Sequence, residues 1–278
     1  MVNVQTAPFT VERQGDFAVA HSTNKLADCP DCGGTGLVRK TIEDGGRKYD
    51  VSAPCQLSKL QGRLGVFNAA QLPAVHSNSE FRTFAPANNE GADALKKARD
   101  FAIGWPKSRR GYVLSGPVGA GKTHLLCATL RHLTIELGVR AAYVEISLLY
   151  ATIRRGFQEG KSGGEIIKPL SEVELLAIDE LGKGRGSPFE METLDELIAR
   201  RYNAGKTTLF ATNYSLKPPE ARQASGYLST SELKDSAKES KILCDRVGER
   251  IYSRLCEMCD FVEFPPTTPD QRRAPRRS

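Results

Sequence analysis

The sequence lacks a long apolar run, and its first 20 residues lack both a basic start and an apolar stretch. A membrane-spanning helix needs about 18 or more consecutive apolar residues, and a secretory leader needs a basic segment followed by an apolar one. We therefore expect no membrane anchor and a cytoplasmic protein. Internal repeats and long low-complexity tracts are also missing. The 278 residues, 40% of them apolar, suffice for one full core and a small second module.

The number of cysteines is odd, so they cannot all pair within one chain. The sequence also lacks a strong excess of positive or negative charge. Seven cysteines in a cytoplasmic chain favour metal binding or ordinary burial over disulfides. A formal charge of +6 permits a polyanionic partner without requiring one. Four arginines cluster in the last seven residues, where they suit either a phosphate backbone or a solvated end: Arg272, Arg273, Arg276 and Arg277.

The chain divides by pattern into a small cysteine-containing module over residues 1–77, an α/β domain over 78–273 and a basic tail over 274–278. The linker that begins at His76 leads into a helix near Ala92–Trp105. Short β-prone apolar runs then alternate with helical patterns, which predicts a parallel sheet covered by helices in three layers. The expected strands are YVLS, AAYVEI, VELLAID, TTLFATN and DFVEF. Helices are expected between Leu126 and Gly138, and from a cap at Ser187.

A phosphate-binding loop lies in the stretch LSGPVGAGKT, residues 114–123. Backbone N–H groups of such a loop converge on phosphate oxygens at a helix N-terminus. We expect Lys122 to bridge the β and γ phosphates and the Thr123 hydroxyl to bind Mg²⁺. The remaining nucleotide contacts are expected from Gly116, Pro117, Gly119, Ala120, Gly121 and His124. The loop alone does not separate kinases, switches, pumps and motors.

Two acids follow the apolar run VELLAID, at Asp179 and Glu180. Asp179 is expected to hold the hydrated Mg²⁺, and Glu180 to polarise an attacking water as a general base. Asn213, after the next strand, can orient that water, although an asparagine is also ordinary at a turn. The acid pair indicates ATP hydrolysis rather than phosphoryl transfer to a metabolite.

Arginines recur at helical spacing in CDRVGERIYSRLCEMCD, at Arg246, Arg250 and Arg254. Val247, Ile251 and Leu255 share that spacing, so a single helix would carry an apolar stripe beside an arginine stripe. The stripe is either a solvated face or the source of an arginine that a neighbouring subunit's nucleotide needs. For that second role we expect Arg254 first and Arg250 second.

The stretch CPDCGGTG places Cys29 and Cys32 at the spacing of a zinc knuckle, with Cys55 as a third candidate Zn²⁺ ligand. A closed structural site needs a fourth ligand, which His21, His76 or another chain could supply. Burial is expected for Cys127 and for the later pair Cys256 and Cys259, because no second pair stands at zinc-ribbon spacing.

The series GPVGAGKT, LLAIDE, TTLFATN, GERIYSRL and a late arginine resembles the AAA+ ATPases of the DnaC/DnaI helicase-loader and IstB transposition-helper group, over residues 80–272. The resemblance implies a homo-oligomeric ring or spiral with ATP at subunit interfaces. It also implies a second sensor arginine after the last strand, where Arg272 follows TPDQ instead of the usual Gly-x-Asp-Tyr. In loaders of this group the N-terminal module binds the replicative helicase, so a DnaB-type helicase is the expected partner.

Contact with single-stranded DNA is likewise implied by the resemblance. Two glycine-rich basic stretches could supply it, one at Arg154 and Arg155 and one at Lys183 and Arg185, although both also read as solvated loops. Neither stretch carries an aromatic stacking platform. The sequence thus indicates an ATPase that loads a replicative helicase. The alternatives are an ATPase helper of a transposase and an ATP-dependent adaptor that hydrolyses slowly; a small-molecule kinase fits the acid pair poorly.

Overall fold

The computed structural model describes residues 8–107, 109–216 and 240–273. At its centre is a five-stranded sheet whose strands all run parallel, in the order β6-β7-β8-β5-β9. The strands are β5 (Gly111–Ser115), β6 (Ala141–Glu145), β7 (Leu175–Asp179), β8 (Thr207–Thr212) and β9 (Cys259–Glu263). All residues of β5, β7 and β8 are buried, as expected for strands covered on both faces. The predicted α/β class and parallel sheet are confirmed.

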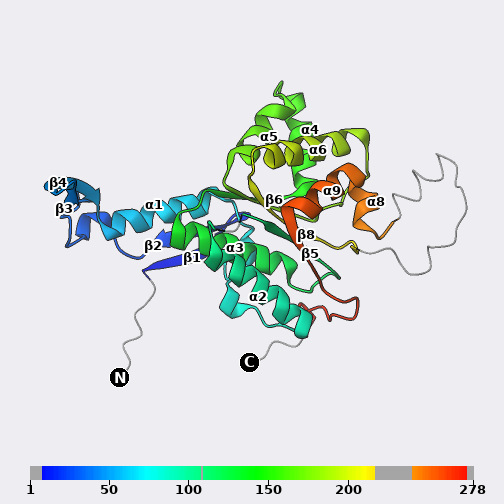
Figure 1. Ribbon diagram of the computed structural model, residues 1–278, viewed down its shortest axis with the longest axis horizontal. Coiled ribbons are helices and arrows are strands. Elements are labelled where there is room, and N and C mark those ends of the chain that lie inside the picture. The colour runs from blue at the N-terminus through cyan, green and yellow to red at the C-terminus, as the bar shows by residue number, and fades with distance from the viewer. Residues whose placement is uncertain (1–7, 108, 217–239, 274–278) are drawn as a thin grey trace, which may run out of the picture.

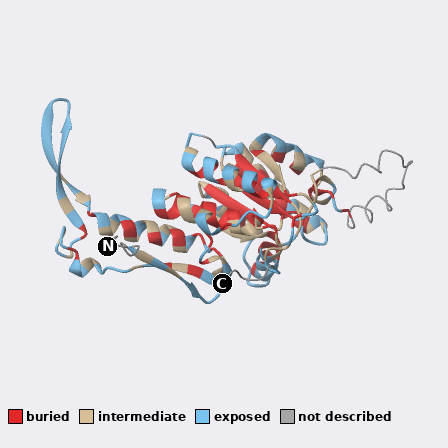
Figure 2. Ribbon diagram, turned by 90° about the horizontal axis from the view of Figure 1, so that it is seen from below, coloured by how far each residue is buried: buried red, intermediate tan, exposed pale blue. Residues whose placement is uncertain are grey.

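Helices cover both faces of this sheet (Figure 1). One face carries α1 (Gln56–Ala69), α2 (Asn89–Gly104) and α3 (Lys122–Leu137). The other carries α4 (Ile146–Gln158), α5 (Gly163–Glu172), α6 (Pro188–Asn203), α8 (Leu243–Val247) and α9 (Glu249–Met258). Each layer has its own apolar core against the sheet, which Figure 2 shows as the buried centre of the molecule.

Local sequence signals explain where several helices begin and end. Ser187 and Glu190 form the predicted capping box of α6, with Pro188 at the first helical position. Gly138 ends α3 in the left-handed conformation, with a φ of 70°. The expected helix near Ala92–Trp105 is α2, which begins three residues earlier because Asn88 caps it.

The predicted single arginine helix is wrong. Gly248, with a φ of 82° and a ψ of 152°, breaks the segment into α8 and α9. Arg246 therefore lies on a different helix from Arg250 and Arg254. A glycine can adopt this backbone conformation without a Cβ clash, and a continuous helix cannot contain it.

The N-terminal module consists of two hairpins and α1. The hairpins pair β1 (Phe9–Gln14) with β2 (Phe17–Ser22), and β3 (Leu37–Asp44) with β4 (Arg47–Pro54). Three single-turn 3₁₀ segments accompany them: η1 (Leu26–Asp28), η2 (Ala74–His76) and η3 (Phe81–Thr83). The β3–β4 hairpin projects from the body and is mostly exposed (Figure 2).

The module is not a separate body on a linker. Leu60, Leu64 and Phe67 of α1 belong to the same apolar core as α3. Arg63 of α1 donates to the Glu136 carbonyl at 2.8 Å, and the Tyr143 amide of β6 donates to the Ala70 carbonyl at 2.9 Å. The predicted boundary near residue 77 therefore lies inside one continuous core. No described helix is long and apolar enough to cross a bilayer.

Candidate nucleotide site

The phosphate loop joins β5 to α3, and its glycines are required by close neighbours. Gly121 has a φ of 94°, and a Cβ there would lie 2.5 Å from the Phe84 ring. Gly119 has a φ of 81°, and a Cβ there would collide with Asp270. Any other residue at these positions would be strained and would displace a neighbouring segment. Residues from before the loop (Phe84) and from after it (Asp270) thus pack against it.

Lys122 lies at the start of α3 and folds back over the loop. Its ammonium donates to the carbonyls of Gly116 and Pro117, both at 2.8 Å. Burial lowers the pKa of Lys122 to about 8, against the opposing attraction of Asp179 and Glu180. Ala120 is fully buried beneath the loop. A buried ammonium whose partners are carbonyls is well suited to meet phosphate oxygens.

A cavity of about 220 Å³ opens over the loop. It brings together most of the predicted nucleotide and catalytic residues with several that the sequence did not single out. Its lining comprises His76, Val118, Gly119, Gly121, Lys122, Thr123, His124, Asp179, Glu180, Thr212, Asn213, Gln271 and Arg272. The acids of β7 and the loop of β5 meet here because the carboxyl ends of parallel strands lie at one edge of a sheet.

Asp179 is held in a defined orientation at the end of β7. The Tyr143 hydroxyl of the neighbouring strand donates to Asp179 Oδ2 at 2.8 Å, and the Glu180 amide donates to Oδ1 at 2.8 Å. Burial and the Asp179 charge raise the pKa of Tyr143, so this phenol stays protonated and remains a donor. Asp179 and Thr123, the two residues predicted to hold Mg²⁺, line the same cavity.

Glu180 has a φ of 56°, in the left-handed region that few residues other than glycine adopt. Its carboxylate accepts a hydrogen bond from Asn213 Nδ2 at 3.2 Å. The Lys183 ammonium lies 3.5 Å from the same carboxylate and 3.3 Å from Glu145 at the end of β6. Unusual backbone geometry at an acid beside a phosphate loop is typical of a functional residue.

The segment after β9 returns to the phosphate loop. The Gln271 amide donates to the Gly119 carbonyl at 3.1 Å, and Gln271 Nε2 donates to the Ala85 carbonyl at 3.0 Å. Arg272 follows and lines the cavity. The missing glycine and tyrosine of the usual motif therefore do not prevent Arg272 from reaching the site. Arg276 and Arg277, with the rest of the predicted tail at 274–278, lie outside the described residues.

The two candidate finger arginines on α9 differ in their surroundings. The Arg254 side chain is only 17% exposed and pairs with Asp195 of α6 at 2.6 Å. Arg250 is 74% exposed, and its nearest acid, also Asp195, is 3.7 Å away. The expected order of the two arginines therefore loses support, because the intramolecular pair must open before Arg254 can act elsewhere.

The predicted DNA contacts do not lie on two comparable loops. Arg154 and Arg155 are in helix α4, and Arg154 pairs at 2.7 Å with the buried Glu190. The same glutamate accepts a hydrogen bond from the Arg185 amide at 2.8 Å, so it anchors the loop that follows β7. Arg155 and Arg185 have exposed side chains. Lys183 lies at the acids of the nucleotide site.

The loop that carries Lys183 and Arg185 is also held from α8. Arg246 donates to the carbonyls of Gly182 at 3.0 Å and Gly184 at 2.6 Å. Its guanidinium stacks over the Tyr214 ring, 5.0 Å from the centroid. The first arginine of the predicted stripe thus fixes this loop.

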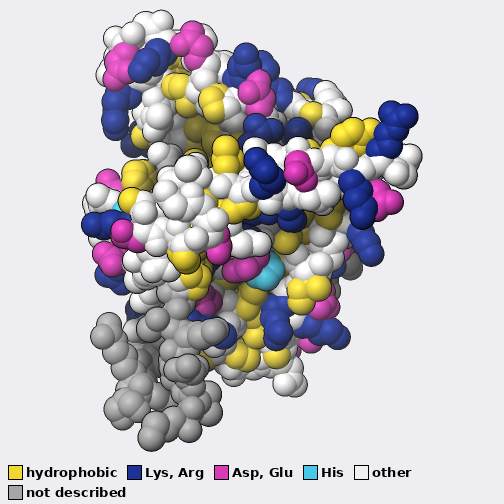
Figure 3. All heavy atoms as spheres, turned by 90° about the vertical axis from the view of Figure 1, so that its left-hand side faces the viewer, with side chains coloured by type: hydrophobic (Ala, Val, Ile, Leu, Met, Phe, Trp, Pro, Cys, Tyr) yellow, Lys and Arg dark blue, Asp and Glu magenta, His cyan; other side chains and the backbone are white. Residues whose placement is uncertain are grey.

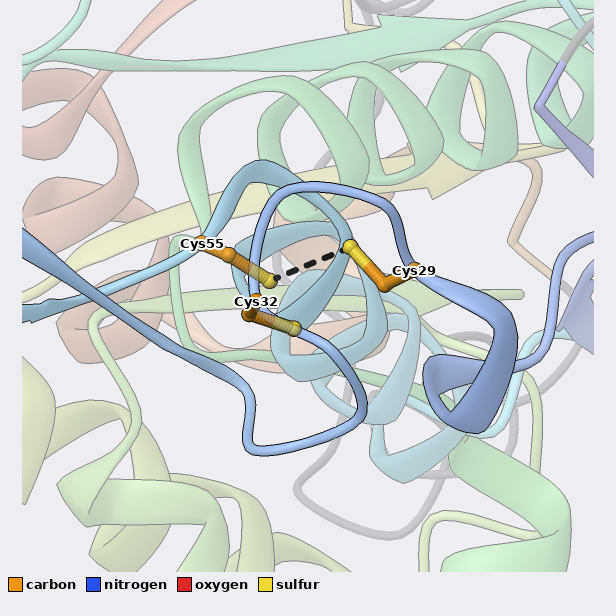
Figure 4. A group of neighbouring side chains, drawn as sticks. All are labelled: Cys29, Cys32 and Cys55. Atoms are coloured by element: carbon orange, nitrogen blue, oxygen red, sulfur yellow. Dashed lines mark hydrogen bonds between the residues drawn. The ribbon is translucent and has the colours of Figure 1, made fainter.

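The three early cysteines do converge (Figure 4). Their sulfurs all lie within 4.8 Å of one another, with 3.9 Å between those of Cys29 and Cys55. The Gly36 amide donates to Cys32 Sγ at 3.2 Å and the Ser58 amide to Cys55 Sγ at 3.3 Å, as at thiolate metal sites. Burial opposes ionisation of Cys32, but the N–H donor of Gly36 and the neighbouring thiols outweigh it and lower its pKa. The donor set fits Zn²⁺.

Neither proposed histidine joins this group of potential ligands within the described part of the chain. His76 lies instead in the nucleotide cavity, so this candidate for the fourth zinc ligand is excluded. Of the later cysteines, Cys127 and Cys259 are buried as expected, whereas Cys256 is exposed.

Sequence reasoning did not single out four residues that line the cavity, His76, Val118, Thr212 and Gln271, nor Tyr143, which donates to Asp179. Tyr143 lies in a strand that was read only as apolar, and His76 was read as the start of a linker or a candidate zinc ligand. The alternation of AAYVE, which places Tyr143 on one face of β6, is the signal that could have identified it.

The sequence model of the family described as IstB-like ATP binding protein matches residues 62–231, more than half of the chain. Replicative helicase loader DnaC of Escherichia coli (strain K12) is 26% identical over 152 residues, which are 54% of this chain and 62% of the relative. The chain thus spans less than two thirds of the length of that curated relative.

Two solved structures share the architecture. The crystal structure of the DnaC helicase loader superposes with a TM-score of 0.55 at 29% identity, covering 69% of this chain and 99% of that one. The crystal structure of DnaI gives a TM-score of 0.53 at 18% identity, over 73% and 98% of the two chains. The second likeness concerns the fold alone.

Proposed function

The chain belongs to the family of IstB-like ATP binding proteins, and on that premise we propose that it hydrolyses ATP as an oligomer on single-stranded DNA and loads a DnaB-type replicative helicase. The observation that carries hydrolysis is the placement of Glu180 and Asn213 at the mouth of the phosphate-loop cavity. The similarity to helicase loader DnaC supports the choice of client.

Several residues of the cavity have a role in hydrolysis. The loop amides and Lys122 bind the phosphates, and Thr123 and Asp179 would hold Mg²⁺, which neutralises charge on the β and γ phosphates. Tyr143 keeps Asp179 oriented. Glu180 takes a proton from the attacking water, and Asn213 holds the Glu180 carboxylate in place for that transfer.

A second copy of the chain is needed to complete this site. Among the described residues, Arg272 is the one arginine that lines the cavity. Charge that builds on the transferred phosphoryl group is commonly met by a further arginine from a neighbouring subunit. Arg250, exposed on α9, is available for that contact, and Arg254 becomes available if its pair with Asp195 opens.

Single-stranded DNA would meet the exposed cations of α4 and of the loop that follows β7. Arg185 and Arg155 have exposed side chains, and Lys183 stands in the same loop as Arg185. Binding of this kind depends on phosphate contacts and weakens steeply with salt.

The N-terminal module would bind the protein client. On the face that carries its hairpins, basic, acidic and apolar side chains are intermixed (Figure 3). A mixed surface suits a protein partner better than a continuous polyanion. We assign Cys29, Cys32 and Cys55 to a structural Zn²⁺ in this module, with the fourth position open to a ligand from another chain.

The test uses the full chain and two variants. Lys122→Ala should lose ATP binding, whereas Glu180→Gln should bind ATP and stall turnover; unchanged hydrolysis in Glu180→Gln would refute the base assignment. The Glu180→Gln protein with ATP then serves as bait in lysate, with Lys122→Ala as the matched control. ATP-dependent recovery of a hexameric replicative helicase supports the loader function, and recovery of a transposase instead overturns it.

A further inference from the structure

His76 lies where the N-terminal module meets the nucleotide cavity. It ends η2, and its imidazole lines the cavity beside Lys122, Thr123 and Asp179. These neighbours belong to the end of the site that receives the phosphates and the metal. Neither the phosphate loop nor the acid pair includes His76, and the family model begins before it and extends far beyond it.

The imidazole has a fixed orientation. Its Nδ1 lies 2.9 Å from the hydroxyl of the buried Ser79. No hydrogen bond from Nε2 to another described residue is present. The Ser79 hydroxyl also lies 3.4 Å from His124 Nδ1. When this hydroxyl donates to His76 Nδ1, the proton of a neutral His76 ring sits on Nε2.

The segment around His76 is tied to the first helix of the phosphate site. The Glu80 carbonyl accepts from His124 Nε2 at 2.9 Å, and the Glu80 carboxylate pairs with Arg131 of α3 at 2.7 Å. Arg131 also donates to the Ser77 carbonyl at 2.6 Å. The residues after His76 therefore move with α3.

The residues before His76 are tied to the β1–β2 hairpin. The Ala74 amide donates to the Asp16 carbonyl at 2.9 Å, and the Ala18 amide donates to the Leu72 carbonyl at 2.8 Å. Phe17 and Pro73 form a bridge between these two bonds. Only Val75 lies between His76 and Ala74, whose amide bonds to the hairpin.

We propose that His76 contacts the phosphate end of bound ATP through Nε2 and couples occupancy of the nucleotide site to the order of the β1–β2 hairpin. The inference rests on ATP binding at this site and does not depend on which client the module binds. A donor to a phosphate oxygen loses its partner when the nucleotide leaves, and the short segment from His76 to Ala74 transmits that difference to the hairpin.

The experiment compares the full-length wild-type chain with His76→Ala, Ala74→Pro and His21→Ala, using a non-hydrolysable ATP analogue with Mg²⁺. Ala74→Pro removes the amide that bonds to Asp16 at the first position of a short helix, where proline is tolerated. His21→Ala is the matched control, because His21 is exposed on the same hairpin. Analogue affinity is measured first, and amide hydrogen exchange over residues 9–22 is measured at saturation.

In the wild type, the analogue should slow exchange in the hairpin. His76→Ala should weaken analogue binding about tenfold, in line with loss of one charge-assisted hydrogen bond, and should lose the protection even at saturation. Ala74→Pro should bind the analogue normally and lose protection, and His21→Ala should behave as wild type. Unchanged affinity in His76→Ala, or full protection at saturation in that variant, overturns the proposal. Failure of the wild type to bind the analogue would instead refute ATP binding itself.

Discussion

The ammonium of Lys183 lies 3.5 Å from the carboxylate of Glu180, the residue assigned to activate the attacking water. The same ammonium lies 3.3 Å from Glu145, so one cation lies between two acids at the mouth of the nucleotide site. Lys183, which was expected to contact DNA, therefore pairs with the proposed general base.

Replacing Lys183 should release Glu180. We expect Lys183→Ala to raise ATP turnover without DNA by up to about fivefold, since a partly exposed ion pair of this kind contributes at most about 1 kcal/mol. Steady-state ATP hydrolysis at low salt measures this. Arg185→Ala is the control, because it also removes a cation from this loop. Arg185 bonds to Glu190 through its backbone amide, which the substitution keeps. Equal turnover in the two variants would show that Lys183 does not restrain Glu180.

The two α9 arginines should separate in function and stability. Arg250→Ala should leave the melting temperature unchanged and lower turnover at least 100-fold, because an arginine supplied to the transition state has effects of this size or larger. Mixing it with Glu180→Gln protein should restore part of the activity at shared interfaces. No recovery at any mixing ratio would contradict action between subunits.

Arg254→Ala should instead lower the melting temperature by several degrees. It removes a 2.6 Å ion pair that is mostly shielded from water, and a loss of about 1–2 kcal/mol shifts a domain of this size by about 2–8 °C. Thermal unfolding of both variants without nucleotide measures this difference. Equal melting temperatures for Arg250→Ala and Arg254→Ala would contradict a stabilising role for the Arg254–Asp195 pair.

Glu190 should make stability depend on acid pH. Burial opposes its ionisation, but Arg154 and the amides of Ser187 and Arg185 outweigh burial and lower its pKa below the ordinary 4.5. The ionised form is thus favoured by folding, so its contribution is complete above about pH 4.5 and is lost as the pH falls through the lowered folded-state pKa.

We expect Glu190→Gln to be less stable than the wild type by about 1–3 kcal/mol at pH 7, and the difference to shrink below about pH 4.5. Urea unfolding at several pH values measures it. Glu192→Gln, two residues further along α6 at an exposed position, serves as the control. A difference that is constant with pH would exclude Glu190 as the source.

Tyr143→Phe should weaken Mg²⁺ binding. The phenol orients Asp179, and loss of such an orienting partner typically lowers metal affinity about 10-fold or more. Titration of Mg²⁺ into ATP-saturated protein should show the shift, with nucleotide affinity in the absence of Mg²⁺ unchanged. If nucleotide affinity fell equally with and without Mg²⁺, the substitution would have distorted the whole site.

Cys55→Ser should remove bound Zn²⁺ and loosen the N-terminal module. Metal content of purified protein should fall from about one Zn²⁺ per chain to below half, since a two-cysteine site is too open to retain it. Cys256→Ser, at an exposed cysteine outside the cluster, should retain the metal. Wild-type protein without stoichiometric metal would refute the zinc assignment.

Features encoded within a few neighbouring residues could be predicted from sequence. The buried strands, the glycine loop, the capping box at Ser187 and the acid pair each depend on local patterns. Because the carboxyl ends of parallel strands lie at one edge of a sheet, the expected parallel sheet was enough to predict that Asp179 lies near the loop. Family membership followed from the series of these motifs and is confirmed.

Features that depend on distant contacts could not be predicted. His76 was one of three candidates for a fourth zinc ligand, chosen from residue type alone, yet its place is set by Ser79 and by the path of the chain over α3. Arg154 was read as part of a loop, yet it lies in α4 and pairs with the buried Glu190. The break at Gly248 did have a local signal, because a glycine inside a helical repeat can mark an interruption.

The continuous core between α1 and α3 limits how this chain can be recombined. Leu60, Leu64 and Phe67 would be exposed to water if residues 1–77 were expressed alone, and α3 would lose its cover. Exchange of the N-terminal module between relatives, in evolution or in a designed chimera, therefore requires matched changes on the facing side of α3. A new client specificity is more readily acquired in the projecting β3–β4 hairpin, which contributes no buried residue to that core.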